Sequence, residues 1–236
     1  MTMGQALSTR RRLLRAAAAL GVLGLGAGGI PPARAGAFTD FFRALQTDDV
    51  GEVRELLRQG FDPNAVDRRG NSALYLALQN HALKVARLLI EQPGLHPDQR
   101  NPEGETALMI ACLRGDADLA AALVRRGAQV NPPGRAAAWS ALSYAATNGH
   151  DDLVKFLLAH GARVNQEAPN GTTPLMMAAY FGHVSTVRLL LAAGADPKLR
   201  NAMGFTAMDL AMKQSHRDTA EVLGRALDAG RKPGQW

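Results

Sequence analysis

The feature that most constrains the fold of this chain is an internal repeat with a period of 33 to 34 residues. An alanine three residues after a Leu or Met marks each unit, at Ala77, Ala111, Ala145, Ala178 and Ala211, with separations of 34, 34, 33 and 33. Paired apolar residues recur in the same phase at Leu56-Leu57, Leu89-Ile90, Leu123-Val124, Leu157-Leu158 and Leu190-Leu191. A glycine then closes the units, at Gly60, Gly94, Gly127, Gly161 and Gly194. Three landmarks in one phase indicate a solenoid of stacked units.

The chemistry of one unit predicts two helices and a turn. A Ser or Thr before the first helix accepts hydrogen bonds from its free amide groups, as at Thr173. Gly115, Gly149 and Gly182 fit a residue in the left-handed conformation that ends that helix. The paired apolar residues bury the second helix. Turns that begin with Asp or Asn and end in a glycine, at 67–70 and 201–204, predict a protruding hairpin. One unit cannot bury its apolar face alone, so the units must stack into an all-α repeat solenoid.

Residues 173–196 carry the most complete copy of the unit: Thr173-Pro174-Leu175, Ala178-Ala179, Gly182-His183, Leu189-Leu190-Leu191 and Gly194-Ala195-Asp196. This pattern resembles the ankyrin repeat, and the resemblance extends over about residues 37–227 in six copies. It implies stacked helix–turn–helix repeats whose protruding hairpin loops and first helices line a concave groove. It also implies a non-catalytic protein that binds another protein there.

The chain departs from the family pattern in three places. The histidine that usually follows the motif's leucine is missing, so the ties that this imidazole makes between hairpins are expected to be lost; its places hold Tyr75, Met109, Ser143, Met176 and Asp209. The turn at 131–139 has Ala138 where a glycine should stand, which predicts a distorted hairpin or a bend. The first and last units carry polar residues that are typical of solubilising caps, including Asp48, Asp49, Glu221 and Arg225.

Residues 1–35 have the three zones of an export signal, and removal of this segment is expected. A basic start contains Arg10 and Arg11, an apolar stretch runs over 16–30, and Ala33 and Ala35 form a small-x-small cleavage pattern. The run from Thr9 to Arg15 resembles the twin-arginine export signal, with Leu13 in place of the usual Phe. The alternatives are a general secretory signal with a chance arginine cluster, and a retained anchor that tethers the array to the inner membrane. Cleavage after Ala35 predicts a bacterial periplasmic protein.

Most of the net positive charge of the chain lies in this segment. The formal net charge is +6, but residues 1–35 contain five arginines and no acidic residue. The remaining 22 basic residues face all 21 acidic ones, which leaves +1 and removes the argument for a nucleic-acid partner. The expected organisation is a signal peptide at 1–35, a repeat domain at 36–228 and a flexible tail at 229–236. A monomer without a stable membrane span after cleavage is expected.

Sequence motifs for catalysis or metal binding are not found. The chain lacks an HExxH motif, a cysteine pair, an EF-hand loop and a glycine-rich phosphate loop. The six histidines are interpreted as loop-ordering groups and Cys112 as a small core residue. We therefore expect no catalytic residue, no metal site and no cofactor. The alternative is an enzyme or metal-binding protein that uses histidines and Cys112.

Binding positions follow from the resemblance, which places variable residues at the hairpin tips and at the end of each first helix. The residues predicted to bind a partner protein are Arg68, Arg69, Arg114, Trp139, Asn148, Tyr180, Phe181, Met203 and Phe205. Glu103 and Glu105 are further hairpin positions. The aromatic residues of this set belong to three successive repeats and could anchor a partner, or could simply pack between hairpins. The protein could support an envelope enzyme or a stress response, or it could neutralise a periplasmic toxin as an immunity protein.

Overall fold

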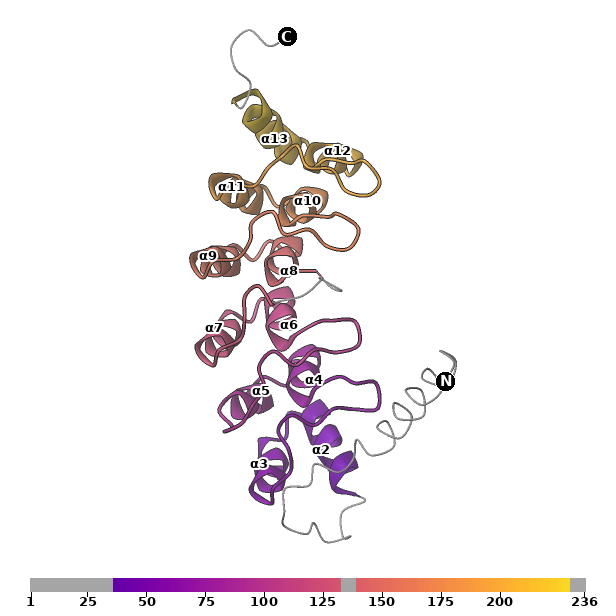
Figure 1. Cartoon of the computed structure of the whole chain (residues 1–236), viewed down its shortest axis with the longest axis vertical. Helices are drawn as coiled ribbons and strands as arrows, with labels where there is room; N and C mark the ends of the chain where they lie inside the picture. The colour runs from indigo at the N-terminus through magenta and orange to yellow at the C-terminus, as the bar shows by residue number, and fades with distance from the viewer. Residues whose placement is uncertain (1–35, 133–138, 230–236) are drawn as a thin grey trace, which may run out of the picture. The chain divides into compact units, whose positions relative to one another are not determined.

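The computed structural model describes residues 36–132 and 139–229. This part of the chain folds into pairs of α-helices joined by short turns (Figure 1). The pairs are α2 (Ala37–Gln46) with α3 (Val50–Arg58), α4 (Ala73–Gln79) with α5 (Leu83–Ile90), α6 (Ala107–Arg114) with α7 (Ala117–Arg125), α8 (Ala141–Thr147) with α9 (Asp151–Ala159), α10 (Pro174–Tyr180) with α11 (Val184–Ala192), and α12 (Ala207–Lys213) with α13 (Arg217–Ala229). Arg10, Arg11, Ala33 and Ala35 of the predicted export signal, and residues 230–236 of the predicted tail, lie outside the described residues.

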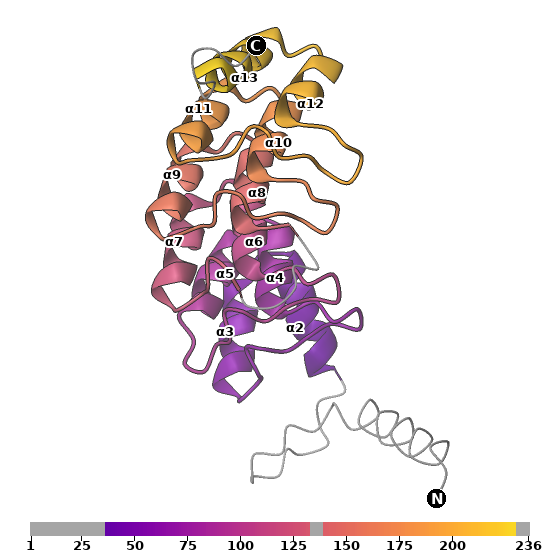
Figure 2. The ribbon, with the colours of Figure 1, turned by 45° about the horizontal axis from the view of Figure 1, so that its top comes forward.

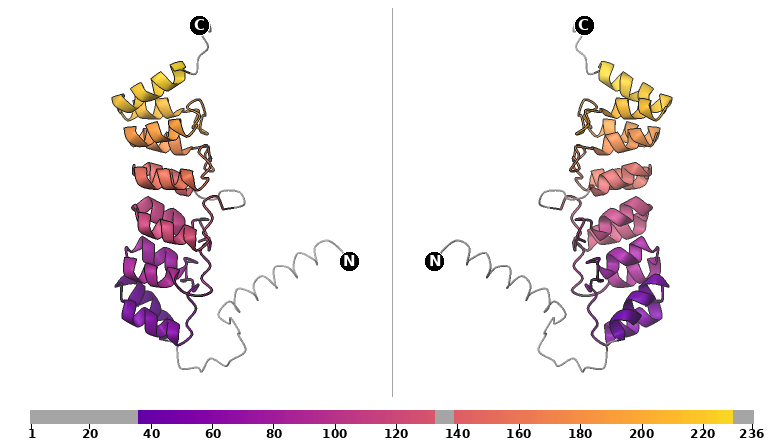
Figure 3. Two further views of the ribbon diagram at one scale, coloured as in Figure 1. Left: turned by 90° about the vertical axis from the view of Figure 1, so that its left-hand side faces the viewer. Right: turned by 90° about the vertical axis from the view of Figure 1, so that its right-hand side faces the viewer.

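The chain divides into two compact units, Met1–Phe38 and Thr39–Trp236, and the second unit holds the repeat array. Within the array the first helices from α4 to α12 contact one another in order, as α4 does α6 and α10 does α12. The second helices α5, α7, α9, α11 and α13 contact one another in the same order (Figure 2). The loops between repeats project to one side of both rows (Figure 3). The predicted all-α solenoid of helix–turn–helix repeats is therefore confirmed.

The first helices begin where the sequence predicts, because their capping residues satisfy free amide groups. Ser72, Thr106, Ser140, Thr173 and Thr206 each accept a hydrogen bond from the backbone N–H three residues later. Thr173 is followed by Pro174 at the first helical position, where a missing N–H costs nothing. At the last repeat Asp209 Oδ2 also accepts from the Thr206 N–H at 2.8 Å, which completes a capping box.

The turn after each first helix is left-handed, as predicted for Gly115, Gly149 and Gly182, whose φ values are +83°, +67° and +74°. The histidine that follows two of these glycines links successive repeats. His183 Nε2 lies 2.9 Å from the carbonyl oxygen of Thr147, and His150 Nε2 lies 3.3 Å from that of Leu113. These contacts agree with the interpretation of the histidines as loop-ordering groups.

Asparagines and backbone groups tie the loops of neighbouring repeats where the family's histidine is missing. Asn131 donates from Nδ2 to the Gly161 carbonyl at 2.7 Å and accepts from the Arg163 N–H at 3.0 Å. Asn64 makes the same pair of bonds two repeats earlier. Between the last two hairpins, the Ala202 N–H donates to the Asn170 carbonyl at 2.9 Å. The loops are thus joined by other donors than the imidazole that the sequence lacks.

The core lies between the two rows of helices, and Leu123, Leu157 and Leu190 are fully buried there. The predicted polar cap at the last repeat is incomplete, because Met212 is 60% exposed on α12. Its equivalent one repeat earlier, Ala179, is fully buried because α12 covers α10. A hollow of about 630 Å³ lies beside Met212, between α12 and α13. The sequence interpretation considered the polar residues of α13 and overlooked the methionines of α12.

Candidate binding surface

The loops between repeats and the ends of the first helices form one surface, which we call the hairpin face. Its loops are residues 66–72, 100–106, 139–140, 167–173 and 200–206. Its helix ends are residues 79–80, 113–114, 147–148, 180–181 and 213–214. All nine predicted binding residues lie on it. The loops contribute Arg68, Arg69, Trp139, Met203 and Phe205, and the helix ends contribute Arg114, Asn148, Tyr180 and Phe181. Their part in binding stays a prediction.

The last two repeats expose large apolar side chains on this face. Tyr180, Phe181 and Met203 are 37%, 44% and 70% exposed. The rings of Tyr180 and Phe181 meet edge to face with centroids 5.0 Å apart. Phe205 is half-buried, and its ring lies 4.9 Å from the ammonium group of Lys213. We call Tyr180, Phe181, Met203 and Phe205 the aromatic cluster; such exposed apolar groups typically mark an interaction site.

Arg114 and Asn148 have a second role that the sequence did not indicate. Arg114 donates from Nη2 to the Gln79 carbonyl at 2.6 Å, and Asn148 donates from Nδ2 to the Leu113 carbonyl at 2.7 Å. The two residues hold the same repeat position, so each ties its repeat to the preceding one. Phe181 holds that position in the next repeat, carries no donor and stays exposed. Binding by Arg114 or Asn148 would therefore compete with a structural contact.

A hydrogen-bonded cluster that the sequence interpretation missed lies at the base of the hairpins. Glu105 accepts from the Tyr75 hydroxyl at 2.6 Å, from the Tyr144 hydroxyl, and from Asn101 Nδ2 at 3.1 Å. The Tyr144 ring in turn lies 6.0 Å from the ring of the half-buried Trp139. Tyr75 belongs to α4 and Tyr144 to α8, so one carboxylate links three successive repeats. The one sequence feature that could have indicated this cluster is Tyr75, which stands at the family's histidine position.

The hydrogen bonds decide the charge of this cluster. Burial alone raises the pKa of Glu105, but the bonds from Tyr144, Tyr75 and Asn101 outweigh it and hold the pKa below its ordinary value. Burial and the neighbouring carboxylate raise the pKa of both tyrosines well above the usual range. At neutral pH the cluster therefore holds one carboxylate and two neutral phenols.

The described residues show no convergence of three or more His, Cys, Asp or Glu side chains that could hold a metal ion. In the same ranges, no helix is both long and apolar enough to cross a membrane. Cys112 is fully buried in α6, which agrees with its interpretation as a core residue.

Burial also makes the Cys112 thiol unreactive, because it raises the pKa far above neutrality and leaves little thiolate. We expect a disulfide reagent such as dithionitrobenzoate to label the native protein only at the rate of unfolding, and one thiol per chain at once in denaturant. Absorbance of the released thiolate measures this. Native labelling as fast as that of a free cysteine peptide would contradict the burial.

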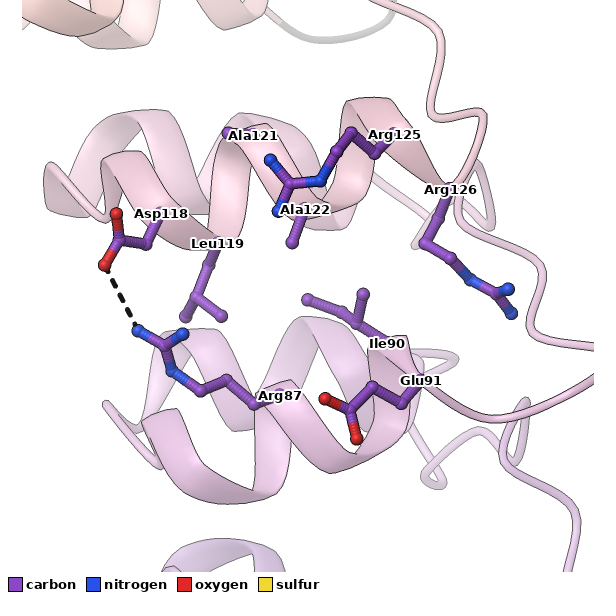
Figure 4. A pocket seen from close by; sticks show the side chains of 9 residues that line it. All are labelled: Arg87, Ile90, Glu91, Asp118, Leu119, Ala121, Ala122, Arg125 and Arg126. Atoms are coloured by element: carbon purple, nitrogen blue, oxygen red, sulfur yellow. Dashed lines mark hydrogen bonds and ion pairs between the residues drawn. The ribbon is translucent and has the colours of Figure 1, made fainter.

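A groove lies between the second helices α5 and α7 (Figure 4). It has a volume of about 470 Å³, and Arg87 of α5 forms an ion pair across it with Asp118 of α7 at 3.3 Å. The hollow arises at Ala122, because the equivalent residues of other repeats are larger: Leu88, Phe156 and Leu189.

Filling this groove is expected to stabilise the array. Ala122→Leu places on α7 the side chain that the equivalent position carries in α5 and α11, and it should raise the free energy of unfolding by about 1 kcal/mol through added apolar burial. Urea denaturation followed by circular dichroism measures the change. Ala117→Leu on the exposed start of α7 is the control and should have little effect. A destabilisation at position 122 would mean that the groove is tighter than the structure shows.

Comparisons with known proteins agree with this architecture. A protein-family model described as ankyrin repeats (3 copies) matches residues 41–134, 92–168 and 142–232. Among solved structures, an ankyrin repeat domain from Acinetobacter baumannii is 28% identical, with a TM-score of 0.67, over 79% of this chain and 96% of its own. A chain of a complex between a predatory endopeptidase of Bdellovibrio bacteriovorus and an immunity protein is 29% identical, with a TM-score of 0.68, over 79% and 97%.

Curated relatives match a shorter part of the chain. The human NF-kappa-B inhibitor epsilon is 36% identical over 97 residues, which are 37% of this chain and 19% of that protein. An I-kappa-B like protein of Microplitis demolitor bracovirus is 29% identical over 37% of this chain and 49% of its own. The chain thus matches less than half the length of either relative.

Proposed function

The chain belongs to the ankyrin-repeat family, and on that premise we propose that it is a non-catalytic protein of the bacterial periplasm that binds another protein through its hairpin face. The observation that carries the proposal is the aromatic cluster. Tyr180, Phe181 and Met203 are half of the six large hydrophobic side chains that the described residues expose. Rigid aromatic groups dominate the binding energy of many interfaces, because they bury a large area at a small entropic cost.

Export to the periplasm rests on the sequence of residues 1–35, with its arginines, apolar stretch and Ala33-x-Ala35 pattern. The twin-arginine route is the proposed one, because the adjacent Arg10 and Arg11 lie in the basic segment that precedes the apolar stretch. N-terminal sequencing of the protein from a periplasmic fraction tests the proposal. A chain that starts at Gly36 supports cleavage, whereas an intact N-terminus in the membrane fraction supports the retained anchor.

Two physiological roles are compatible with this surface. The first is support of an envelope enzyme or a stress response. The second is neutralisation of a periplasmic toxin, and one observation favours it: this chain matches 97% of a chain from the complex of an endopeptidase with an immunity protein. An immunity role predicts that the gene adjoins one for a secreted enzyme and that the protein inhibits that enzyme. Support of an enzyme predicts that the activity rises.

The partner can be identified by affinity capture from periplasmic extract of the source bacterium. Three baits are compared: the mature wild type, Tyr180→Ala/Phe181→Ala, and Met212→Ala. Met212 is an exposed apolar residue outside the hairpin face and serves as the matched control. We expect a protein that the wild type and the control retain and the double variant loses. Equal retention by all three baits would overturn the assignment to the hairpin face.

A further inference from the structure

The Glu105 carboxylate is half-buried and held in place by hydrogen bonds. Its oxygens accept from Tyr75, Tyr144 and Asn101, and in the described ranges none of the ion pairs includes Glu105 or the exposed Glu103. Arg114, at the end of α6, is committed to the Gln79 carbonyl. Three hydrogen bonds hold the Glu105 carboxylate charged and in place, so an approaching cation would meet a preorganised anion.

The last repeat shows how a cation pairs with an aromatic ring on this face. Phe205 stands two residues before α12, and the Lys213 ammonium at the end of that helix lies 4.9 Å from its ring centroid. Trp139 holds the same position before α8, and Thr147 stands where Lys213 would be. Trp139 therefore has no lysine at the position that corresponds to Lys213, and its ring neighbours Tyr144, which bonds to Glu105.

We propose that the hairpin face takes a lysine or arginine side chain of the partner protein between the Trp139 ring and the Glu105 carboxylate. The inference rests on the proposed function and names the chemistry of the partner at this position. The indole ring attracts the cation through its π face, and the carboxylate adds a charge-assisted hydrogen bond. Because the cluster is half-buried, both attractions are less screened than at an open surface.

The test uses capped tripeptides on the full mature chain. Trp139 and Trp236 are the two tryptophans, so a Trp236→Phe background makes the Trp139 indole N–H a single reporter in proton–nitrogen NMR. Acetyl-Gly-Arg-Gly-amide should shift this resonance saturably, with a dissociation constant on the order of millimolar. The citrulline peptide has the same shape without the charge and should bind at least about tenfold more weakly. Equal shifts from the two peptides, or no shift, would overturn the proposal.

Two variants separate the site from general effects on folding. Glu105→Gln removes the charge and keeps an acceptor for the tyrosines, so arginine-peptide affinity should fall about tenfold or more. Thr147→Lys copies the Phe205–Lys213 arrangement, so its own ammonium should occupy the ring and abolish the peptide response. Glu91→Gln, on the exposed end of the second repeat, is the matched control and should change nothing. An unchanged response in Thr147→Lys would contradict the proposed geometry.

The peptide test and the partner test can fail separately. If the arginine peptide fails to bind but the Tyr180→Ala/Phe181→Ala variant loses the partner, the cation site is wrong and the binding face stands. If the peptide binds as expected but all three baits retain the partner, the cation site stands as a peptide-binding site and the assignment of the partner to the hairpin face falls.

Discussion

Gly149→Ala is expected to lower the free energy of unfolding by about 3 kcal/mol. The residue has φ +67°, and the left-handed region alone costs a side chain about 1–2 kcal/mol. An added Cβ would also lie 2.6 Å from Nδ1 of His183. That ring cannot move without losing its hydrogen bond to the Thr147 carbonyl, which contributes about 1 kcal/mol. Urea denaturation of the mature chain measures the change.

Gly161→Ala is the matched control, because Gly161 has a similar φ of +80° but nothing within 4 Å of the added Cβ. It should cost only the backbone part, about 1–2 kcal/mol. His183→Ala in the Gly149→Ala background should recover the steric part, so the double-mutant cycle should show a favourable coupling. Equal losses in the two glycine variants would show that the histidine ring is not fixed over the turn.

Glu105→Ala is the second large effect, with an expected loss of about 2–4 kcal/mol, because three donors lose a charged acceptor. Glu105→Gln should lose less, since it keeps one carbonyl oxygen. A loss below 1 kcal/mol for Glu105→Ala, measured by urea denaturation, would mean that the carboxylate does not brace the three repeats.

The effect of Glu105→Gln on the free energy of unfolding is expected to depend on pH. The pKa of Glu105 is lowered in the folded state, so its contribution is present above the ordinary glutamate pKa and is lost as the pH falls through the folded-state pKa. The pKa values of Tyr75 and Tyr144 are raised, so their contribution is present below the ordinary tyrosine pKa of about 10 and is lost as the pH rises through the raised values. The stability difference between wild type and Glu105→Gln should therefore be largest near neutral pH. A difference that stays constant from acid to alkaline pH would contradict the cluster.

The sequence predicted the fold because each landmark of the repeat has a local cause. Thr173 caps a helix wherever it precedes one, and Gly149 accepts a left-handed turn regardless of its neighbours. The interactions that it did not predict are those between repeats. Glu105 meets Tyr144 across 39 residues, and Arg114 meets a carbonyl that every residue carries. Neither contact leaves a local pattern.

The sequence predicted where the candidate binding residues lie, but not which of them are hydrogen-bonded to a neighbouring repeat. The family resemblance placed Tyr180, Phe181 and Met203 on one strip, and the structure exposes all three. It could not tell that Asn148 is tied to the Leu113 carbonyl, because only the folded array brings them together. The hollow at Ala122 could have been found by aligning the repeats, since its equivalents are larger.

The central claim is that the hairpin face binds a partner protein. The most direct test is a calorimetric titration of the captured partner, purified, into the wild type, Tyr180→Ala/Phe181→Ala and Met212→Ala. We predict that the double variant binds at least about 30-fold more weakly, the loss typical of a hot spot of 2 kcal/mol, and that the control binds like the wild type. Wild-type affinity in the double variant, or an equal loss in the Met212 control, would contradict the claim.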